Sequence, residues 1–294
     1  MAIEDELLSF IEKNSAADAS KNRNIEMVAF YYGFRREVWP TLEETAKEFN
    51  NITRERVRQL INSNFKNIVD KSQIPSAKII ADVISSRRYW MQSDLELVLV
   101  DMELVAGDFS IRGFLNLLQD LGIDNNYDIY TPELEKAQRS TINNFEQLFL
   151  IRNEDANEIS DFYKKALKLP GRCGIANLNY LNAEGNNFSF WSALLKELIR
   201  FTPKSWVKEI KNEFWYLFES RNNTLINYSE KVFSVFDTCE VSKMAVAYRN
   251  ALARRTHNYP YPPVEIIAEY LRSSIFFINI QDVLSFTGDP EPIS

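Results

Sequence analysis

The chain has few of the residues that build covalent or metal-bound cores. Its 294 residues include two cysteines and one histidine. Cys173 and Cys239 are too few for a disulfide framework, and one added histidine does not complete a zinc site. His257 has no partner for general-base catalysis or metal binding, so we interpret it as a turn residue. The sequence therefore predicts no metal and no cofactor.

Long apolar runs are also missing. No stretch reaches the roughly 18 to 20 apolar residues that a membrane helix needs. The nearest, residues 95–105, is interrupted by carboxylates. The opening residues, MAIEDELLSF, are acidic where a signal peptide would be basic. We expect a folded cytoplasmic protein without a membrane role, and 294 residues fit two or three modules better than one.

Catalytic constellations are absent too. No nucleophile–base pair, phosphate-binding loop or metal set can be assembled from the sequence. Asp94, Glu96, Asp101 and Glu103 cluster as in metal-dependent nucleases, but they alternate with residues of buried type and no lysine follows at catalytic spacing. A solvated acidic edge is the favoured interpretation, and we expect no enzyme and no catalytic residues.

Charge is distributed unevenly along the chain. The net charge of −7 argues against non-specific coating of nucleic acid. Residues 21–71 nevertheless carry ten Lys/Arg against seven Asp/Glu, whereas residues 94–135 carry ten acids and one base, Arg112. The chain thus predicts a basic N-terminal module followed by an acidic middle.

Residues 39–66, WPTLEETAKEFNNITRERVRQLINSNFK, contain two helix starts separated by a turn. Thr41 to Glu44 form the T-x-x-E capping box that begins one helix. Asn50-Asn51 tolerate the left-handed conformation of a tight turn, and Thr53 can cap the next helix. In the second helix Val57, Leu60, Ile61 and Ile68 form an inward stripe. This order predicts a helix-turn-helix.

The outward side of the second helix carries the residue types that read bases, namely Arg54, Glu55, Arg58, Gln59 and Asn62. Arginine pairs with guanine, glutamine with adenine, and glutamate accepts from cytosine, each discriminating by about 1–3 kcal/mol. The alternative is a solvated helix face with i, i+4 charge pairs. Because both caps and the turn occur in the right order, we favour DNA.

Residues 21–70 resemble region four of the sigma-70 family, on the strength of Tyr32-Gly33, TLEETAKEF and TRERVRQL. The resemblance implies that the second helix reads the major groove of duplex DNA. It implies base contacts from Arg54, Glu55, Arg58 and Gln59, and phosphate contacts from Thr53, Arg56 and the helix start at Leu42. Asn62 and Lys66 complete the expected DNA-binding residues.

This sequence departs from the family pattern in three places. Its turn, FNNITRER, is one residue longer and lacks the usual glycine, and the helix continues as LINSNFKNI without the family's basic residues. Nothing resembles region two, which melts promoters. We therefore do not expect the chain to initiate transcription as a sigma factor by itself.

The remaining chain predicts mostly helices. Residues 75–90 are helical, 94–105 fit helix or strand, and 108–123 fit a short extended segment and then a helix ending at Gly122. Residues 131–151 and 159–171 add helices. Trp191, Trp206 and Trp215 are better core residues than a stacking platform for bases.

The last 70 residues predict three helices followed by a hairpin at 275–286, which is the order of a winged helix. They resemble, more weakly, winged-helix modules of bacterial sigma-like regulatory and defence-associated proteins. Residues 241–257 carry four bases and no acid. We expect either a second DNA contact here or, nearly as well supported, contact with a protein. The four bases are Lys243, Arg249, Arg254 and Arg255.

The expected fold class is mainly α, a helix-turn-helix followed by helical and winged-helix-like modules with small β-hairpins. Expected domains are 1–72, an acidic middle module at 73–168 and a C-terminal part at 169–294. The expected function is sequence-specific binding of double-stranded DNA by a bacterial or phage transcriptional regulator. The alternative is an adaptor that binds RNA polymerase or a defence complex through the sigma-like unit and the acidic middle.

Overall fold

The computed structural model of the protein contains two compact units, Met1–Ala156 and Asn157–Ser294. Of the expected domain boundaries, residue 168 lies within a helix and residue 72 lies outside the described residues. No described helix is both long and apolar enough to cross a membrane. The structure describes residues 2–14, 21–34, 39–50, 52–68, 74–107, 109–123, 125–138, 144–184, 188–220, 223–253 and 261–288.

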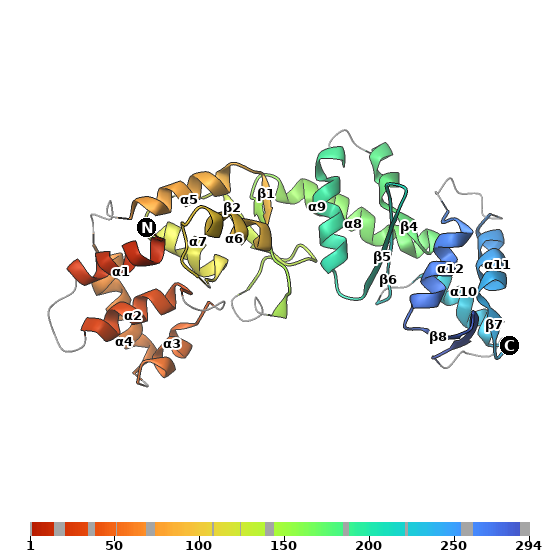
Figure 1. The fold of residues 1–294 in the computed structure, drawn as a ribbon, viewed down its shortest axis with the longest axis horizontal. Coiled ribbons are helices and arrows are strands. Elements are labelled where there is room, and N and C mark those ends of the chain that lie inside the picture. The colour runs from red at the N-terminus through yellow and green to blue at the C-terminus, as the bar shows by residue number, and fades with distance from the viewer. Residues whose placement is uncertain are drawn as a thin grey trace. The chain divides into compact units, whose positions relative to one another are not determined.

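The architecture is mainly helical with small three-stranded antiparallel sheets, as the sequence predicts (Figure 1). Before residue 68, the regular elements among the described residues are helices. The sequence predicts one apolar side of α1 made of Ile3, Leu7, Leu8 and Ile11; Ile3, Leu7 and Ile11 are buried, and Leu8 is partly buried. Gly33 ends α2 with a φ of 80°. The elements are α1 Ile3–Asn14, α2 Lys21–Tyr31, α3 Leu42–Glu48, α4 Arg54–Ile61 and the π-helix η1 Asn62–Lys66.

The rest of the described chain repeats one order of elements three times: helix, strand, helix, helix and a pair of strands. In each repeat the last strand lies between the other two, giving the orders β1-β3-β2, β4-β6-β5 and β7-β9-β8. The first repeat comprises α5 Pro75–Ser85, β1 Tyr89–Met91, α6 Gln92–Asp101, α7 Ile111–Asp120, β2 Tyr127–Tyr130 and β3 Phe149–Arg152.

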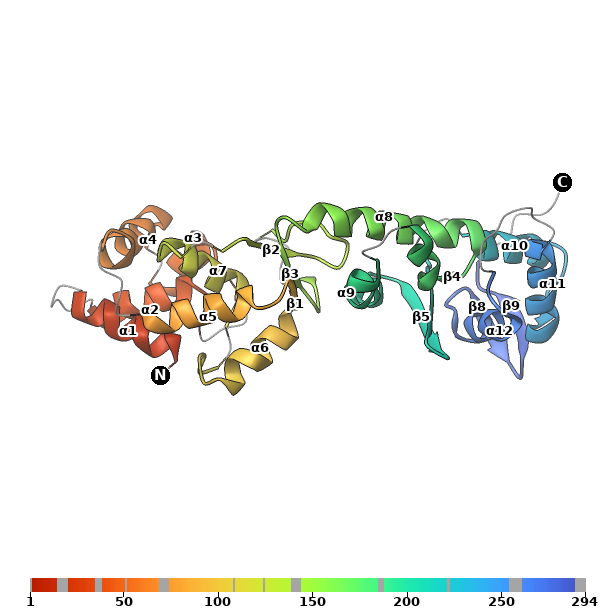
Figure 2. The ribbon, with the colours of Figure 1, turned by 90° about the horizontal axis from the view of Figure 1, so that it is seen from above.

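The second and third repeats follow without a long linker, and Figure 2 shows the elements of the third lying together. The second comprises α8 Ala156–Cys173, β4 Ala176–Asn177, the 3-10 helix η3 Leu178–Glu184, α9 Phe188–Phe201, β5 Ser205–Ile210 and β6 Glu213–Phe218. The third comprises α10 Thr224–Phe233, β7 Cys239–Glu240, α11 Val241–Ala253, α12 Val264–Ser273, β8 Phe277–Ile280 and β9 Val283–Phe286.

Two expectations for the middle of the chain are now decided. Residues 94–105, for which helix and strand were both open, contribute most of α6. The prediction of a helix within 131–151 is wrong. The described residues there form no α-helix, and Phe149–Arg152 forms strand β3. This strand pairs with both β1 and β2, and its Phe149 and Ile151 are residue types enriched in strands.

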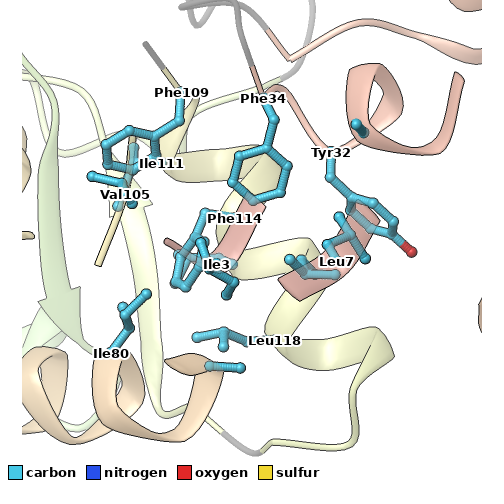
Figure 3. Close-up of a cluster of buried hydrophobic side chains, with 14 of the residues drawn as sticks. Ile3, Leu7, Tyr32, Phe34, Ile80, Val105, Phe109, Ile111, Phe114 and Leu118 are labelled. Atoms are coloured by element: carbon cyan, nitrogen blue, oxygen red, sulfur yellow. The ribbon is translucent and has the colours of Figure 1, made fainter. Parts of the chain in front are cut away.

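The N-terminal helices and the first repeat share one hydrophobic core (Figure 3). Ile3 and Leu7 of α1 meet Phe114 and Leu118 of α7 in this cluster. Gly113 permits the close approach, because a Cβ there would lie 2.1 Å from the carbonyl oxygen of Tyr32. The helices before residue 68 are therefore fixed to the first repeat by packing.

The β5–β6 hairpin has apolar residues on both faces. One face packs in its own repeat and the other in the third, so the hairpin joins the two repeats. Trp215 and Leu217 belong to the core cluster of the third repeat. The opposite face serves its own repeat, since Tyr216 donates a hydrogen bond to the carbonyl of Ala166 in α8, at 2.8 Å. Lys208 pairs with Glu269 of α12 at 2.6 Å. The two repeats form one continuous body.

Candidate nucleic-acid interface

Helix α3 begins at the predicted capping box. The Thr41 hydroxyl accepts a hydrogen bond from the backbone N–H of Glu44 at 3.1 Å, and the Thr41 N–H donates to the Glu44 carboxylate at 2.6 Å. Both bonds satisfy N–H groups that the first turn of a helix leaves without partners. Ala46 is buried, and Leu42 and Phe49 pack partly buried against the core. The predicted start and inward side of this helix are confirmed.

Replacing Thr41 with alanine tests how much the cap contributes. We expect the free energy of unfolding of the first unit to fall by about 1 kcal/mol, because the Glu44 N–H loses the Thr41 hydroxyl as its acceptor, while the bond from the Thr41 N–H to the Glu44 carboxylate can still form. Thermal denaturation followed by circular dichroism measures the change. Thr41→Ser is the control, since serine retains the hydroxyl, and equal losses in the two variants would contradict a capping role.

The turn between α3 and α4 contains a left-handed residue. Asn50 has a φ of 64°, which asparagine adopts more readily than most residues other than glycine. Asn51 lies outside the described residues. Thr53 caps α4, as predicted, by accepting from the N–H of Arg56 at 3.2 Å. Asn50 thus supplies the left-handed residue that the sequence predicts for this turn.

Helix α4 separates an anchored side from an exposed one. Val57, Leu60 and Ile61 are buried in the core of the first unit, which confirms the inward stripe. The side chains on the opposite side are solvent-exposed: Arg54, Glu55, Arg56, Arg58 and Gln59. The α-helix was expected to continue through Ile68, but it ends at Ile61 and becomes π-helical over η1, where Phe65 is buried and Asn62 is partly buried.

Three of the expected base-reading side chains contact one another. Glu55 accepts two hydrogen bonds from Arg58, at 2.9 and 2.6 Å, and a third from the Gln59 amide at 3.2 Å. The hydrogen bonds from Arg58 lower the pKa of the Glu55 carboxyl, so the pair is fully charged at neutral pH. The three side chains thus form one hydrogen-bonded cluster on the exposed side.

Lys66, expected to contact phosphate, takes part in an internal ion pair. Its ammonium lies 2.7 Å from the Asp120 carboxylate at the end of α7 and 5.7 Å from the centre of the Tyr31 ring. The Tyr32 hydroxyl donates to the same carboxylate at 2.7 Å. These partners lie more than 50 positions from Lys66 or on another helix, so no local pattern could have revealed them. Lys66 ties the end of η1 to the first repeat.

The second candidate DNA contact is only partly within the described residues. Lys243 at the start of α11 pairs with Glu240 at 2.7 Å, and Arg249 lies 5.7 Å from the centre of the Tyr261 ring. Arg254 and Arg255 lie outside the described residues. Glu240, the acid that pairs with Lys243, immediately precedes the stretch 241–257, so the absence of acids within that stretch does not leave Lys243 unpaired. Of the two described members, Lys243 is exposed but paired, and Arg249 is partly buried.

Comparison with protein-family models, with curated proteins and with solved structures finds no match for this chain. Among the described residues, no three of the side chains that commonly bind metals come together as a site. The buried Cys173 thiol has its pKa raised to about 12 by desolvation and donates to the carbonyl of Leu169. Cys173 is thus a protonated core residue at neutral pH.

Proposed function

We propose that this protein is a sequence-specific double-stranded DNA-binding protein, a bacterial or phage transcriptional regulator acting in the cytoplasm. The observation that carries the proposal is α4. Its start is capped by Thr53, its inward side is buried, and its outward side exposes Arg54 and Glu55 in the first turn and Arg58 and Gln59 in the next. Recognition helices of helix-turn-helix proteins present such side chains to base edges in the major groove.

The Glu55–Arg58–Gln59 cluster suits base recognition. An exposed ion pair contributes about 0–1 kcal/mol to stability, so exchanging it for base contacts costs little. Arg58 can then donate two hydrogen bonds to a guanine, while Glu55 accepts from the amino group of a neighbouring cytosine. The buried side of α4 keeps the helix in place during this exchange, because Val57, Leu60 and Ile61 remain in the core.

The three repeats support a body of winged-helix modules behind this reading helix. Their element order and strand order are those of a winged helix, in which the third helix often reads DNA. In the third repeat that helix is α12, and the preceding hairpin covers it: the Trp206 indole donates to Ser273 at 2.8 Å, and Lys208 pairs with Glu269. The proposal therefore gives α12 a structural role.

Selection of bound sequences from a random duplex pool tests the proposal, followed by affinity measurements on Arg58→Ala. We expect the selected duplex to bind this variant about 10- to 100-fold more weakly, with discrimination lost at one or two base pairs, because a bidentate contact contributes about 1–3 kcal/mol. Arg56→Ala is the matched control for phosphate contact. It should weaken binding evenly across sequences and lower the salt dependence.

We choose Arg56 for the phosphate control, although Lys66 is also an expected phosphate contact, because a Lys66 variant would also lose its ion pair with Asp120. Arg58 is exposed, so its variant should melt with the wild type. If no duplex is enriched at physiological salt, or if Arg58→Ala binds the selected duplex as tightly as wild type, the proposal fails.

One observation favours the adaptor as a second function. Helix α6 and the residue after it expose Leu97, Val100 and Met102, with Asp94 and Asp101 beside them. Apolar side chains among acids suit a protein partner with a basic, apolar groove, such as RNA polymerase. Co-purification of polymerase with the wild type, and its loss with Leu97→Lys, would favour the adaptor if duplex selection gives no enrichment.

A further inference from the structure

A cavity of about 450 Å³ lies in the first unit beside α7. This volume is within the range of sites that enclose small organic ligands. Its polar lining combines one guanidinium, four amide side chains and a tryptophan ring, contributed by the segment before α3, by α7 and by the loops around β2 and β3. The residues are Trp39, Arg112, Asn116, Gln119, Asn125 and Asn153.

Helix α7 has two different sides. Phe114, Leu117 and Leu118 are fully buried in the shared core, and Figure 3 shows Phe114 and Leu118 within it. Arg112, Asn116 and Gln119 recur at i, i+4 and i+7, which places them together on the cavity side. α7 is the third helix of its repeat, the position from which winged helices read bases. Its cavity side carries the residue types that recognise base edges.

The cavity has a donor that its protein surroundings leave unsatisfied. The Asn116 amide nitrogen is buried and has no hydrogen-bond partner among the described residues. A buried donor without an acceptor costs about 1–3 kcal/mol, so rotation of the Asn116 amide toward a ligand acceptor in the cavity would be favoured. Asparagine and glutamine amides each offer a donor beside an acceptor, which matches the adjacent acceptor and amino group on the edge of adenine.

Two flat side chains that line the cavity beside these amides contact each other. The Arg112 guanidinium carbon lies 5.5 Å from the centre of the Trp39 ring. Guanidinium planes and indole rings both stack on nucleobases. Asp128, also in the lining, accepts from Arg112 at 3.4 Å and from Lys136 at 2.6 Å, so these three charges sum to about +1. This charge tolerates one phosphate group, and the lining has no lysine cluster for a polyphosphate.

We propose that this cavity binds the purine base of a nucleoside or nucleoside monophosphate. The amides of Asn116 and Gln119 hold the base edge, and the Trp39 and Arg112 planes contact its face. Duplex DNA fits less well, because a helix that enters the major groove must project from its surroundings, whereas these side chains line a hollow. The cavity does not depend on DNA binding by α4.

Titration calorimetry on the full chain with adenosine, AMP, guanosine and GMP tests the proposal. We expect at least one of these purines to bind, and Asn116→Leu to weaken its binding about tenfold or more, through loss of the amide. Gln119→Ala, at an exposed position, should also weaken it. Asn14→Leu, which changes an amide of the same unit outside the lining, should bind as wild type does.

Two results of the calorimetry would overturn the proposal. Absence of binding by all four purines at about 1 mM overturns the proposal. Wild-type affinity in Gln119→Ala together with Asn116→Leu also overturns it, and if Asn116→Leu does not fold, Gln119→Ala decides alone. If AMP binds more strongly than adenosine, the net positive charge of Arg112, Asp128 and Lys136 contacts the phosphate group. Duplex affinity measured on the same preparations distinguishes failure here from failure of the DNA-binding proposal.

Discussion

Gly113→Ala should lower the free energy of unfolding of the first unit by about 3 kcal/mol or more, the upper end of overpacking effects. An added Cβ would lie 2.1 Å from the oxygen and 2.7 Å from the carbon of the Tyr32 carbonyl. Both are backbone atoms, so the helix itself must move. In an open helical site the same change would stabilise by up to about 1 kcal/mol. Because α7 lies so close to the end of α2, the change at Gly113 destabilises the unit instead of stabilising it.

Gly107→Ala is the matched control for this prediction, because nothing lies within 4 Å of its added Cβ. Thermal denaturation should show a midpoint about 10 °C lower for Gly113→Ala and near wild type for Gly107→Ala. Duplex binding should weaken with Gly113→Ala at temperatures where the wild type is folded, since α3 and α4 share this core. Equal midpoints for the two variants would contradict the packing described for α7.

Leu217→Ala should destabilise the second unit by about 2–5 kcal/mol. Leu217 is fully buried in β6 and belongs to the core cluster of the third repeat, although the strand belongs to the second. The cavity it leaves therefore removes contacts between the two repeats. Because both depend on this hairpin, we expect their unfolding to remain one transition, shifted to lower temperature or lower urea concentration.

Ile280→Ala provides the comparison in the last hairpin. Ile280 is 67% exposed on β8, so its truncation should change the unfolding free energy by less than about 0.5 kcal/mol. Urea titrations followed by tryptophan fluorescence report on Trp206 and Trp215 near the same interface. If Leu217→Ala separates the unfolding into two steps, or unfolds at the wild-type urea concentration, the hairpin does not join the repeats as described.

Local signals explain what the sequence predicted. The capping box at Thr41, the cap at Thr53 and the spacing of Val57, Leu60 and Ile61 depend only on residues a few positions apart. Such signals fix helix starts and inward sides, because the hydrogen bonds and the periodicity are intrinsic to one helix. The last hairpin was predicted for the same reason, since its strands are adjacent in sequence.

Features that depend on distant segments were not predictable in this way. Strand β3 pairs with β1 and β2, and neither partner is adjacent to it in the sequence. The ion pair of Lys66 with Asp120 joins residues 54 positions apart, so the charge of Lys66 appeared available for DNA. The exposed cluster around Glu55 could be read from i, i+3 and i, i+4 spacing, which places those side chains together on any helix.

The two-faced β5–β6 hairpin also has a consequence for synthesis of the chain. During translation the second repeat is complete once Phe218 has left the ribosome, before any of the third repeat has appeared. At that moment Trp206, Trp215 and Leu217 lack the residues of the third repeat that they pack with in the finished protein. The nascent chain therefore exposes an aromatic sheet face until about 50 further residues have been added, a transient binding site for chaperones.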